Sequence, residues 1–356
     1  MNELNKKITA RQIKLLGFFT YGKHYSISTI IEHAKESPSS LATCKRDLTS
    51  LSNNGFINKH GIKRVLTYTL SDFGLLFRPF DLRDYANTAE KDKLSSQEYN
   101  FTLLDILERE PLFTEEELAK LENATKEYKA KSFGGSELLH KKELERFIIE
   151  LSWKSSKIEG NTYTLLDTEK LLKDGIHSIT HTRDEAMMIL NHKKAFEYIL
   201  DLKKHRKSIV LFRELENIHR ILMENLGVDH GIRKGAVGIT GSTYLPLSIA
   251  STIEEQTKRL LDVVQKKKDP YSKALITIAC IGYLQPFVDG NKRTSRLFGN
   301  AILIEESVAP LSYRSVDEVQ YREAMLVFYE QNGIQPFKEI FIEQYLFACK
   351  NYNIQS

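Results

Sequence analysis

One stretch decides the expected fold of this 356-residue chain: Leu284-Gln285-Pro286-Phe287-Val288-Asp289-Gly290-Asn291-Lys292-Arg293-Thr294-Ser295-Arg296. The apolar run before it, from Tyr271 to Leu284, has helical spacing and predicts a buried helix that Pro286 ends. Because a proline disfavours the helical region for the residue before it, Gln285 is expected at the junction of helix and loop. The turn residues Asp289 to Asn291 then lead into a second predicted helix.

The start of this second helix has the features of an anion site. The first backbone N–H groups of a helix lack intrahelical partners, and the helix dipole favours negative charge there. Arg293 and Arg296 are three residues apart and share one helical face, where two cations oppose the dipole unless an anion is bound. Asp289 adds an acidic oxygen that suits Mg²⁺ shared with a nucleotide. A polar loop before an ordinary charged helix is the alternative interpretation.

A second unusual feature lies upstream, at Glu159. The pattern from Glu143 to Ile158 predicts a helix, and Gly160-Asn161 is a C-cap signal that places Glu159 at the negative end of that helix. A carboxylate is unfavourable there, but it would be stabilised if it faced the two arginines, because an Arg–carboxylate pair is strong and geometrically specific. A solvated glutamate is the alternative.

Both stretches resemble motifs of the Fic family. The first is similar to the Fic motif, His-Pro-Phe-x-Asp/Glu-Gly-Asn-Gly/Lys-Arg-x-x-Arg, and departs from it at Gln285, which stands where the motif has histidine. The second is similar to the family's inhibitory motif, Ser/Thr-x-x-x-Glu-Gly/Asn, at Ser155, Glu159 and Gly160. The resemblance covers about residues 138 to 350 and implies a helical Fic domain with an inhibitory helix (143–160), a β-hairpin flap (233–247) and a Fic loop (285–296).

The resemblance also implies a function. It suggests a transferase that binds ATP and Mg²⁺ and moves AMP onto a Ser, Thr or Tyr hydroxyl of a protein. In such a protein, Glu159 would inhibit by drawing Arg296 away from the γ-phosphate, and Asp289 would hold Mg²⁺. The residues implied to contact the nucleotide are Gly290, Asn291, Lys292, Arg293 and Arg296, with Tyr321 and Tyr329 flanking the adenine.

Gln285 limits this activity. The histidine that it replaces takes the proton from the attacking hydroxyl, and general-base catalysis typically contributes about 10²–10⁴-fold. An amide has no useful basicity, so we expect the chain to bind ATP but to transfer AMP poorly or not at all. Whether Gln285 is natural or engineered is left open. Lys292 also occurs in relatives that transfer phosphate, which leaves the transferred group open as well.

One non-helical segment interrupts the helical pattern, at residues 233–247. Val237 and Ile239 alternate with other residues before Gly241-Ser242, which predicts a small hairpin. Its unpaired edge, at Val237, Gly238 and Ile239, would dock an extended segment of the target protein by strand addition. By its position this segment resembles the family's flap. A hairpin used for packing alone is the alternative.

The N-terminal residues have a different pattern. Residues 1–75 hold eleven Lys/Arg against five Asp/Glu, a balance of +6 in a chain whose total is +4. Helices are predicted over residues 8–20, 28–34 and 39–51, and strands over 56–57 and 66–70. This order resembles a winged helix-turn-helix domain, predicted over residues 1–76, in which these residues would contact DNA: Ser39, Ser40, Thr43, Lys45, Arg46, Lys63 and Arg64. A winged helix used for protein contacts is the alternative, and the sequence leaves homodimer formation open.

The remaining chain is predicted to be almost entirely helical. Residues 77–137 are expected to hold a polar linker, over about 77–100, and a charged helix over 115–131 that is either a solvated spacer or a partner surface. The Fic-like domain over 138–350 is predicted to contain helices at 138–159, 167–173, 183–202, 211–226, 251–266, 271–284, 291–306, 317–331 and 336–350. The expected fold class is therefore mainly α, with a small winged-helix (α+β) domain first.

Composition adds expectations about location. No apolar run reaches membrane length, and the polar start is not typical of a signal peptide, so we expect a soluble, cytoplasmic protein without membrane contact. Cys44, Cys280 and Cys349 are far apart and favour buried thiols over disulfides or a zinc site. Two hypotheses follow: a self-inhibited AMP transferase impaired by Gln285, and a non-catalytic, ATP-responsive regulator that binds DNA.

Overall fold

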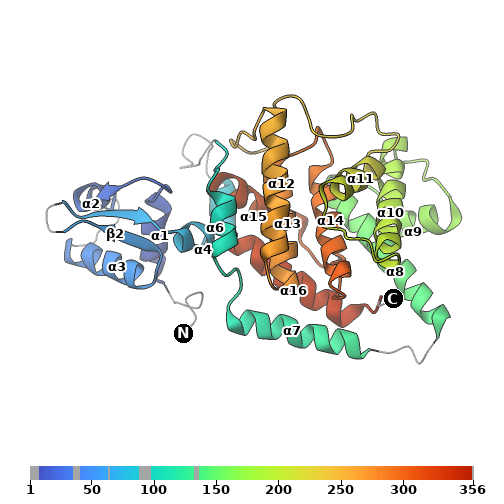
Figure 1. Cartoon of the computed structure of the whole chain (residues 1–356), viewed down its shortest axis with the longest axis horizontal. Helices are drawn as coiled ribbons and strands as arrows, with labels where there is room; N and C mark the ends of the chain where they lie inside the picture. Colours follow the sequence, from blue (N-terminus) through green and yellow to red (C-terminus); the bar gives the residue numbers. More distant parts are fainter. Residues whose placement is uncertain (1–7, 35–40, 63–64, 88–97, 132–135, 355–356) are drawn as a thin grey trace. The chain divides into compact units, whose positions relative to one another are not determined.

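The structure is a computed structural model that describes residues 8–34, 41–62, 65–87, 98–131 and 136–354. It is mainly helical with one small sheet, as the sequence predicts (Figure 1). The chain divides into two compact units, each described by itself. The first unit comprises residues 1–115, 239–245 and 323–337; the second comprises 116–238, 246–322 and 338–356.

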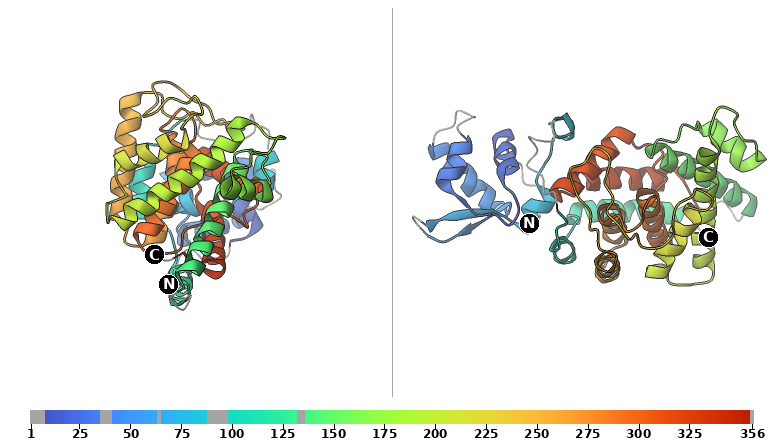
Figure 2. Two further views of the ribbon diagram at one scale, coloured as in Figure 1. Left: turned by 90° about the vertical axis from the view of Figure 1, so that its right-hand side faces the viewer. Right: turned by 90° about the horizontal axis from the view of Figure 1, so that it is seen from above.

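The N-terminal part of the first unit combines short helices with an antiparallel sheet in the order β1-β3-β2. Ile57 lies opposite Leu70, and Tyr25 lies opposite Tyr68. The first three helices gather on one side of the sheet (Figure 2). The elements are α1 (Ala10–Phe18), β1 (Tyr25–Ser26), α2 (Ile27–Ala34), α3 (Leu41–Asn53), β2 (Ile57–His60), β3 (Thr67–Leu70), α4 (Asp72–Phe77), α5 (Leu82–Asn87) and α6 (Leu103–Arg109).

A buried carboxylate joins α3 to α1. Asp47 is 5% exposed and accepts hydrogen bonds from Arg11 through Nε (2.5 Å) and Nη2 (2.9 Å). This two-point arginine contact has a specific geometry, so it fixes the angle of α3 as well as its distance from α1. The neighbouring Lys45 and Arg46 remain exposed.

The second unit contains the long helices, except that residues 323–337, which include most of α15 and the start of α16, belong to the first unit. The elements are α7 (Glu115–Ala130), α8 (Glu137–Ile158), α9 (Leu165–Asp174), α10 (Arg183–Lys204), α11 (Phe212–Leu222), α12 (Ala250–Lys266), α13 (Pro270–Leu284), α14 (Asn291–Glu305), α15 (Glu318–Gln331) and α16 (Gln335–Asn351). The helices predicted from residue 115 onward are all present, with ends displaced by a few residues.

Helices α13 and α14 form the centre of this unit (Figure 1). They pack against each other most extensively, and α14 also contacts α8, α10 and α11. A Cβ at Gly299 would lie 2.5 Å from Cγ1 of Ile278, so the close approach of α14 to α13 depends on this glycine. The N-terminus of α14, where the predicted anion site begins, is thereby placed in the interior of the helical unit.

Three expectations differ from the structure. Residues 233–247 form no hairpin: they contain one turn, from the Ser242 N–H to the Ile239 carbonyl, and one isolated bridge, from Leu245 to Glu98. The two alternating apolar residues are too few to form a ladder, and glycines at 235, 238 and 241 weaken extended structure. The region predicted as a linker contains α5 and, after residues 88–97, α6; helix α7 is packed, not solvated throughout, because it buries Leu121, Thr125 and Tyr128.

The structure also bears on the cysteines and on the length of the apolar helices. Cys44, Cys280 and Cys349 are buried and unbridged, as predicted. None of the helices in the described part of the chain has the length and apolarity needed to cross a lipid bilayer.

We expect Gly74→Ala to destabilise the first unit. A Cβ at Gly74, in α4, would lie 2.0 Å from the carbonyl oxygen of Phe56, a backbone atom that cannot move aside cheaply. The matched control is Gly17→Ala in α1, where a Cβ meets nothing within 4 Å. Alanine at this position should raise the free energy of unfolding by about 0.5–1 kcal/mol. Urea unfolding of the full chain measures both, and equal midpoints for the two variants would contradict this packing.

We also expect His192 to make stability depend on pH. The side chain is fully buried in α10, and burial, with Arg296 and Arg293 nearby, lowers its pKa to about 3. A histidine in the unfolded chain has a pKa of about 6.5, so on acidification the unfolded chain binds this proton before the folded protein does. The contribution of His192 to the free energy of unfolding is therefore complete above about pH 6.5 and is lost as the pH falls toward about 3.

The His192→Leu variant should therefore lose less unfolding free energy than the parent on going from pH 7 to pH 5, by about 2 kcal/mol. The control variant is His177→Gln, which removes a histidine from an exposed position. An identical pH dependence in the parent and in His192→Leu would show that the buried ring is not the cause.

Candidate active site

The loop between α13 and α14 begins at Gln285 in an unusual conformation. Gln285 is the C-cap of α13 and adopts the left-handed region, with φ 49° and ψ 58°. Non-glycine residues enter this region at a cost of about 1 kcal/mol or more, so surrounding contacts must stabilise it. The Gln285 side chain is 8% exposed, and its Nε2 donates to the Gly282 carbonyl at 2.5 Å.

Asn291 closes the loop from the other side. Its Oδ1 accepts from the Phe287 N–H at 2.9 Å, and its Nδ2 donates to the Phe287 carbonyl at 2.8 Å and to Gln285 Oε1 at 2.9 Å. One buried amide therefore satisfies both backbone groups of Phe287 and one oxygen of Gln285. The predicted nucleotide contact at Asn291 is, in this structure, a support for the shape of the loop.

Two residues from outside the motif hold the same loop. Arg233 is 2% exposed; its Nε donates to the Gln285 carbonyl at 2.5 Å, and its backbone N–H donates to the Pro286 carbonyl at 3.0 Å. His219 lies flat against Phe287, with ring centroids 3.7 Å apart, and its Nε2 donates to the Asp289 carbonyl at 2.9 Å. Burial lowers the pKa of His219 to about 4, so the ring is neutral and acts as a donor.

Gly290 makes the turn into α14. It adopts φ 78°, and a Cβ there would lie 2.6 Å from Cε of Met223. The left-handed conformation therefore favours glycine, and a larger residue would also have to displace the flexible end of Met223. Because Gly290 has no side chain to cap the helix and the first turn of α14 contains no acidic residue, the N-terminus of α14 keeps its positive character.

Arg293 carries an unused hydrogen-bond donor at this helix start. The side chain is 4% exposed, its Nη2 lies 3.4 Å from Asp289 Oδ2, and its buried Nη1 has no hydrogen-bond partner. Burial lowers the pKa of Arg293. A buried donor without an acceptor is costly, so this guanidinium and the free N–H groups of α14 together form a site that an anion would complete.

Arg296, in contrast, forms an ion pair and two hydrogen bonds with residues of α8 and its C-cap. It has no exposed surface; Nη1 lies 2.8 Å from Glu159 Oε1, Nε donates to Ser155 Oγ at 3.0 Å, and Nη2 donates to the Ser155 carbonyl at 2.8 Å. Although burial by itself lowers the pKa of Arg296, the Glu159 carboxylate reverses that effect and raises it. The structure thus brings Glu159 and Arg296 together at the C-cap of α8.

Lys292, in the first turn of α14, lies within reach of Glu159 at the end of α8. Its Nζ lies 3.8 Å from Glu159 Oε2, while the Glu159 side chain remains 18% exposed. The contact is long and partly open to water, so its contribution to stability is small. Glu159 therefore neutralises one buried arginine strongly and one surface lysine weakly.

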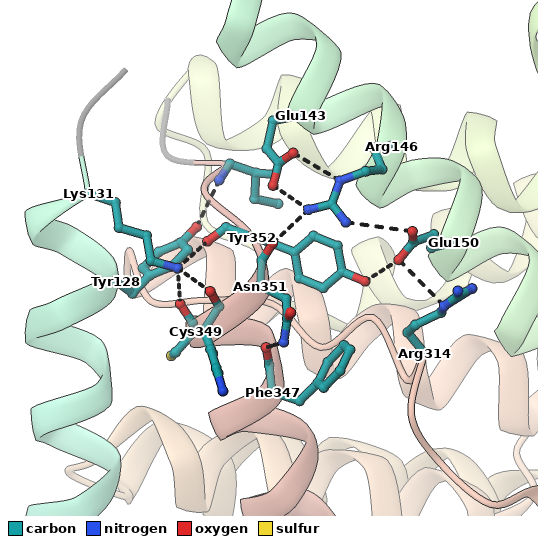
Figure 3. A network of polar contacts seen from close by, with 12 residues as sticks. Tyr128, Lys131, Glu143, Arg146, Glu150, Arg314, Phe347, Cys349, Asn351 and Tyr352 are labelled. Atoms are coloured by element: carbon teal, nitrogen blue, oxygen red, sulfur yellow. Dashed lines mark hydrogen bonds and ion pairs between the residues drawn. The ribbon is translucent and has the colours of Figure 1, made fainter. Parts of the chain in front are cut away.

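A polar network holds the other half of α8 (Figure 3). Arg146, on α8, donates to the Asn351 carbonyl at 2.6 Å, and the Tyr352 hydroxyl donates to Glu150, one turn further along α8. Lys131 donates to the carbonyls of Cys349 (2.5 Å) and Lys350 (2.7 Å) at the end of α16. The contacts of Arg146 and Tyr352 join the end of α16 and the residue after it to α8, the helix that carries Glu159. The contacts of Lys131 join the end of α16 to the residue that follows α7.

Asp289 is the accessible acidic group of the loop. Its side chain is 66% exposed beside the start of α14. Mg²⁺ in nucleotide sites is commonly bound by one or two carboxylates together with substrate phosphates, so a single exposed carboxylate next to the unused Arg293 donor fits the ion.

The two tyrosines expected at the adenine are both buried. Tyr321 is 2% exposed and faces Arg296, whose guanidinium lies 5.7 Å from the ring centroid. Tyr329 is also 2% exposed and stacks with Tyr244, in the first unit. The helical spacing identified their element correctly, but both rings are covered by neighbouring side chains.

The other predicted contact residues are placed as follows. Val237 is partly buried, Gly238 is exposed and Ile239 is buried. Thr43 is partly buried on α3, where it accepts from Arg46 Nη2 at 3.3 Å. Ser39, Ser40, Lys63 and Arg64 lie outside the described residues.

Sequence reasoning missed the role of Arg233, whereas His219 is a structural hydrogen-bonding residue, as its place in a helix favours. The patterns assigned Arg233 only to a non-helical segment and His219 to a helix as a structural residue. Each binds backbone carbonyls 50 or more residues away, and backbone acceptors leave no mark in the sequence. An arginine at the start of a glycine-rich segment is the one local signal that could have indicated such a contact.

Comparisons with known proteins agree with this geometry. Residues 210–303, which contain α11 to most of α14, match the Fic/DOC family. The chain is 26% identical over 183 residues to "Protein adenylyltransferase Fic" from Drosophila mojavensis and 28% identical over 177 residues to the protein of the same name from Nematostella vectensis. These alignments cover 51% and 48% of this chain but only 36% and 40% of the relatives' length.

Solved structures show the same fold. A Fic family protein from Desulfovibrio desulfuricans superposes with a TM-score of 0.58 at 21% identity, over 68% of this chain and 75% of that one. Fic-1 (residues 134–508) from C. elegans superposes with a TM-score of 0.54 at 18% identity, over 98% of this chain and 99% of that one. Residues 210–303, which hold the loop and most of α14, therefore match the Fic/DOC family, and the helices around them have the fold of these solved Fic proteins.

Proposed function

We propose that this protein is a Fic-type transferase that binds ATP with Mg²⁺ and moves AMP to a Ser, Thr or Tyr hydroxyl of a protein, and that it is self-inhibited by Glu159. The observation that carries the proposal is the contrast between two buried arginines one helical turn apart. Arg293 has an unused donor at a helix N-terminus, and Arg296 is occupied by Glu159 and Ser155. Adenylyltransferase relatives at 26% and 28% identity support the reaction class.

The residues of this chain divide the work in the proposed reaction. Gly290, Asn291 and Lys292 form the start of α14 that cradles phosphate, and Arg293 neutralises its charge. Asp289 would hold Mg²⁺, which when bound neutralises further charge on the phosphates. Because Glu159 engages Arg296, the nucleotide lacks its second arginine and is held in an unproductive position.

Gln285 is the second restraint on activity. Its amide is engaged by Gly282 and Asn291 and is 8% exposed, so it neither accepts a proton nor presents itself to an incoming hydroxyl. Gln285 contacts Asn291 at the start of α14, and this proximity supports the proposal that a histidine at position 285 would act as a base.

Val237, Gly238 and Ile239 are the proposed docking residues for the target. Without a preformed hairpin, they would form extended structure only when a target segment supplies the partner strand. Arg233 supports this role, because it joins the start of the segment to the backbone of Gln285 and Pro286.

We expect the variant that combines Glu159→Gly with Gln285→His to label itself or proteins of a cell lysate when incubated with Mg²⁺ and α-labelled ATP. The parent should label at least about 10²-fold less, the lower end of a general-base contribution. The matched control is Asp174→Gly with Gln285→His, since Asp174 also precedes a C-cap glycine, at the exposed end of α9. A parallel reaction with γ-labelled ATP distinguishes AMP transfer from phosphate transfer.

Labelling by Glu159→Gly alone would contradict the account of Gln285. If the double variant labels nothing, the transferase proposal fails, and the alternative of a non-catalytic ATP-responsive regulator remains.

We further propose that the N-terminal part is a winged helix-turn-helix that binds DNA. Its three helices and β1-β3-β2 sheet support this, as do the exposed Lys45 and Arg46 beside the inward-facing Asp47 on α3. Asp47 fixes the helix so that the two cations face solvent. Phosphate contacts would supply affinity, and side chains of α3 would supply specificity.

We expect Lys45→Ala and Arg46→Ala each to weaken DNA binding and to reduce the slope of log K against log salt by about 1. Lys14→Ala, at an exposed position on α1, is the control and should leave the slope unchanged. Fluorescence anisotropy with duplex DNA at several salt concentrations measures this, and failure of the parent to bind any duplex at low salt would exclude DNA binding.

A further inference from the structure

A buried glutamate joins three segments of the first unit. Glu330 is 1% exposed on α15. One carboxylate oxygen, Oε1, accepts from the Ser242 hydroxyl at 2.9 Å and from the Thr243 N–H at 3.0 Å. The other, Oε2, accepts from the Tyr85 hydroxyl at 2.6 Å. The two oxygens therefore bind different segments, the loop 239–245 through Oε1 and helix α5 through Oε2.

The loop residues have further contacts with each other and with α15. The Tyr244 N–H donates to Ser242 Oγ at 3.2 Å, and the Tyr244 ring stacks with Tyr329, the residue before Glu330, at 6.4 Å between centroids. Because the glutamate and this tyrosine are adjacent on α15, they fix three successive loop residues. The loop 239–245 contains no regular secondary structure, so these side-chain contacts define its conformation.

From Glu330 Oε2, a series of hydrogen bonds extends through Tyr85 to the end of α1. Tyr85 accepts from Gln331 Nε2 at 3.4 Å, and Gln331 Oε1 accepts from Arg78 Nη2 at 2.5 Å. Arg78 is 3% exposed, and its Nη1 donates to the carbonyls of Leu16 (3.2 Å) and Phe19 (2.7 Å) at the end of α1. A continuous series of hydrogen bonds thus extends from α1 to the loop, within one compact unit.

We infer that Glu330 is a positioning residue for the loop 239–245, and that Tyr85 controls this positioning from the N-terminal side. A carboxylate whose two oxygens are bound by two segments couples those segments, because a change in the donors on one oxygen shifts the group that also holds the other segment. The loop follows directly on Val237 and Gly238 and begins with Ile239, and these three are the proposed docking residues. A ligand on the N-terminal helices would in this way alter the surface offered to the protein target, an extension that rests on the proposed function.

Hydrogen exchange of the full-length protein tests the positioning role without any need for activity. Tyr85→Phe removes the hydroxyl that donates to Glu330 Oε2, and it should speed exchange of the Thr243 amide by about tenfold, the effect of weakening one charge-assisted hydrogen bond. Tyr198→Phe is the matched control, since the Tyr198 hydroxyl donates to Glu214 at 2.5 Å, outside this series of contacts. It should leave exchange in residues 239–245 unchanged.

Two substitutions of Glu330 allow a double-mutant cycle with Tyr85→Phe. Glu330→Gln keeps an acceptor for the loop and should retain most of the protection of Thr243, whereas Glu330→Met, of similar volume without acceptors, should lose it. In the Glu330→Met background, Tyr85→Phe should add nothing further. The inference is overturned if Tyr85→Phe leaves exchange of 239–245 at the parental rate, or if its effect is the same with and without the carboxylate.

An activity measurement separates this inference from the proposed function. In the Glu159→Gly, Gln285→His background, adding Tyr85→Phe should lower the rate of protein labelling at saturating ATP while the KM for ATP stays the same. Absence of labelling in every variant would reject the transferase and leave the exchange result intact. Unchanged exchange together with normal labelling would reject the role of Glu330 and leave the transferase intact.

Discussion

The constraint on which the site depends is the complete burial of Arg296. A guanidinium without exposed surface must be paired and hydrogen-bonded, because an unpaired buried charge costs several kcal/mol. Glu159 and Ser155 satisfy it, and both belong to α8. The end of α8 is therefore tied to the second turn of α14, while the network around Arg146 and Tyr352 ties its other half to the chain after α16.

Some polar side chains around the loop between α13 and α14 hold its backbone, and others are left to bind a ligand. Asn291, Arg233 and His219 use their polar atoms on backbone groups of the loop and leave it little freedom to move. This support stabilises the left-handed Gln285, which would otherwise strain the turn. Arg293 and the first N–H groups of α14 remain for a ligand, so a rigid loop presents a small number of unused donors.

Glu330 and Glu159 use the same physical device for different purposes. Each is a carboxylate near a helix end that binds groups distant in the sequence, Glu159 at 137 residues from its arginine and Glu330 at more than 80 from its loop partners. Glu159 neutralises a cation of the anion site, whereas Glu330 orders an irregular segment. Both contacts are buried, where water does not screen them.

The sequence by itself determined the helices from residue 115 onward, the helix–loop–helix around Pro286 and the position of Glu159 at a helix end, because periodicity, proline and capping signals act between near neighbours. Tertiary structure decided the rest. It turned a predicted hairpin at 233–247 into an irregular loop, buried Tyr321 and Tyr329, and assigned Arg233 to the carbonyl of Gln285. These outcomes depend on backbone acceptors and packing partners far along the chain, whose identity no local pattern encodes.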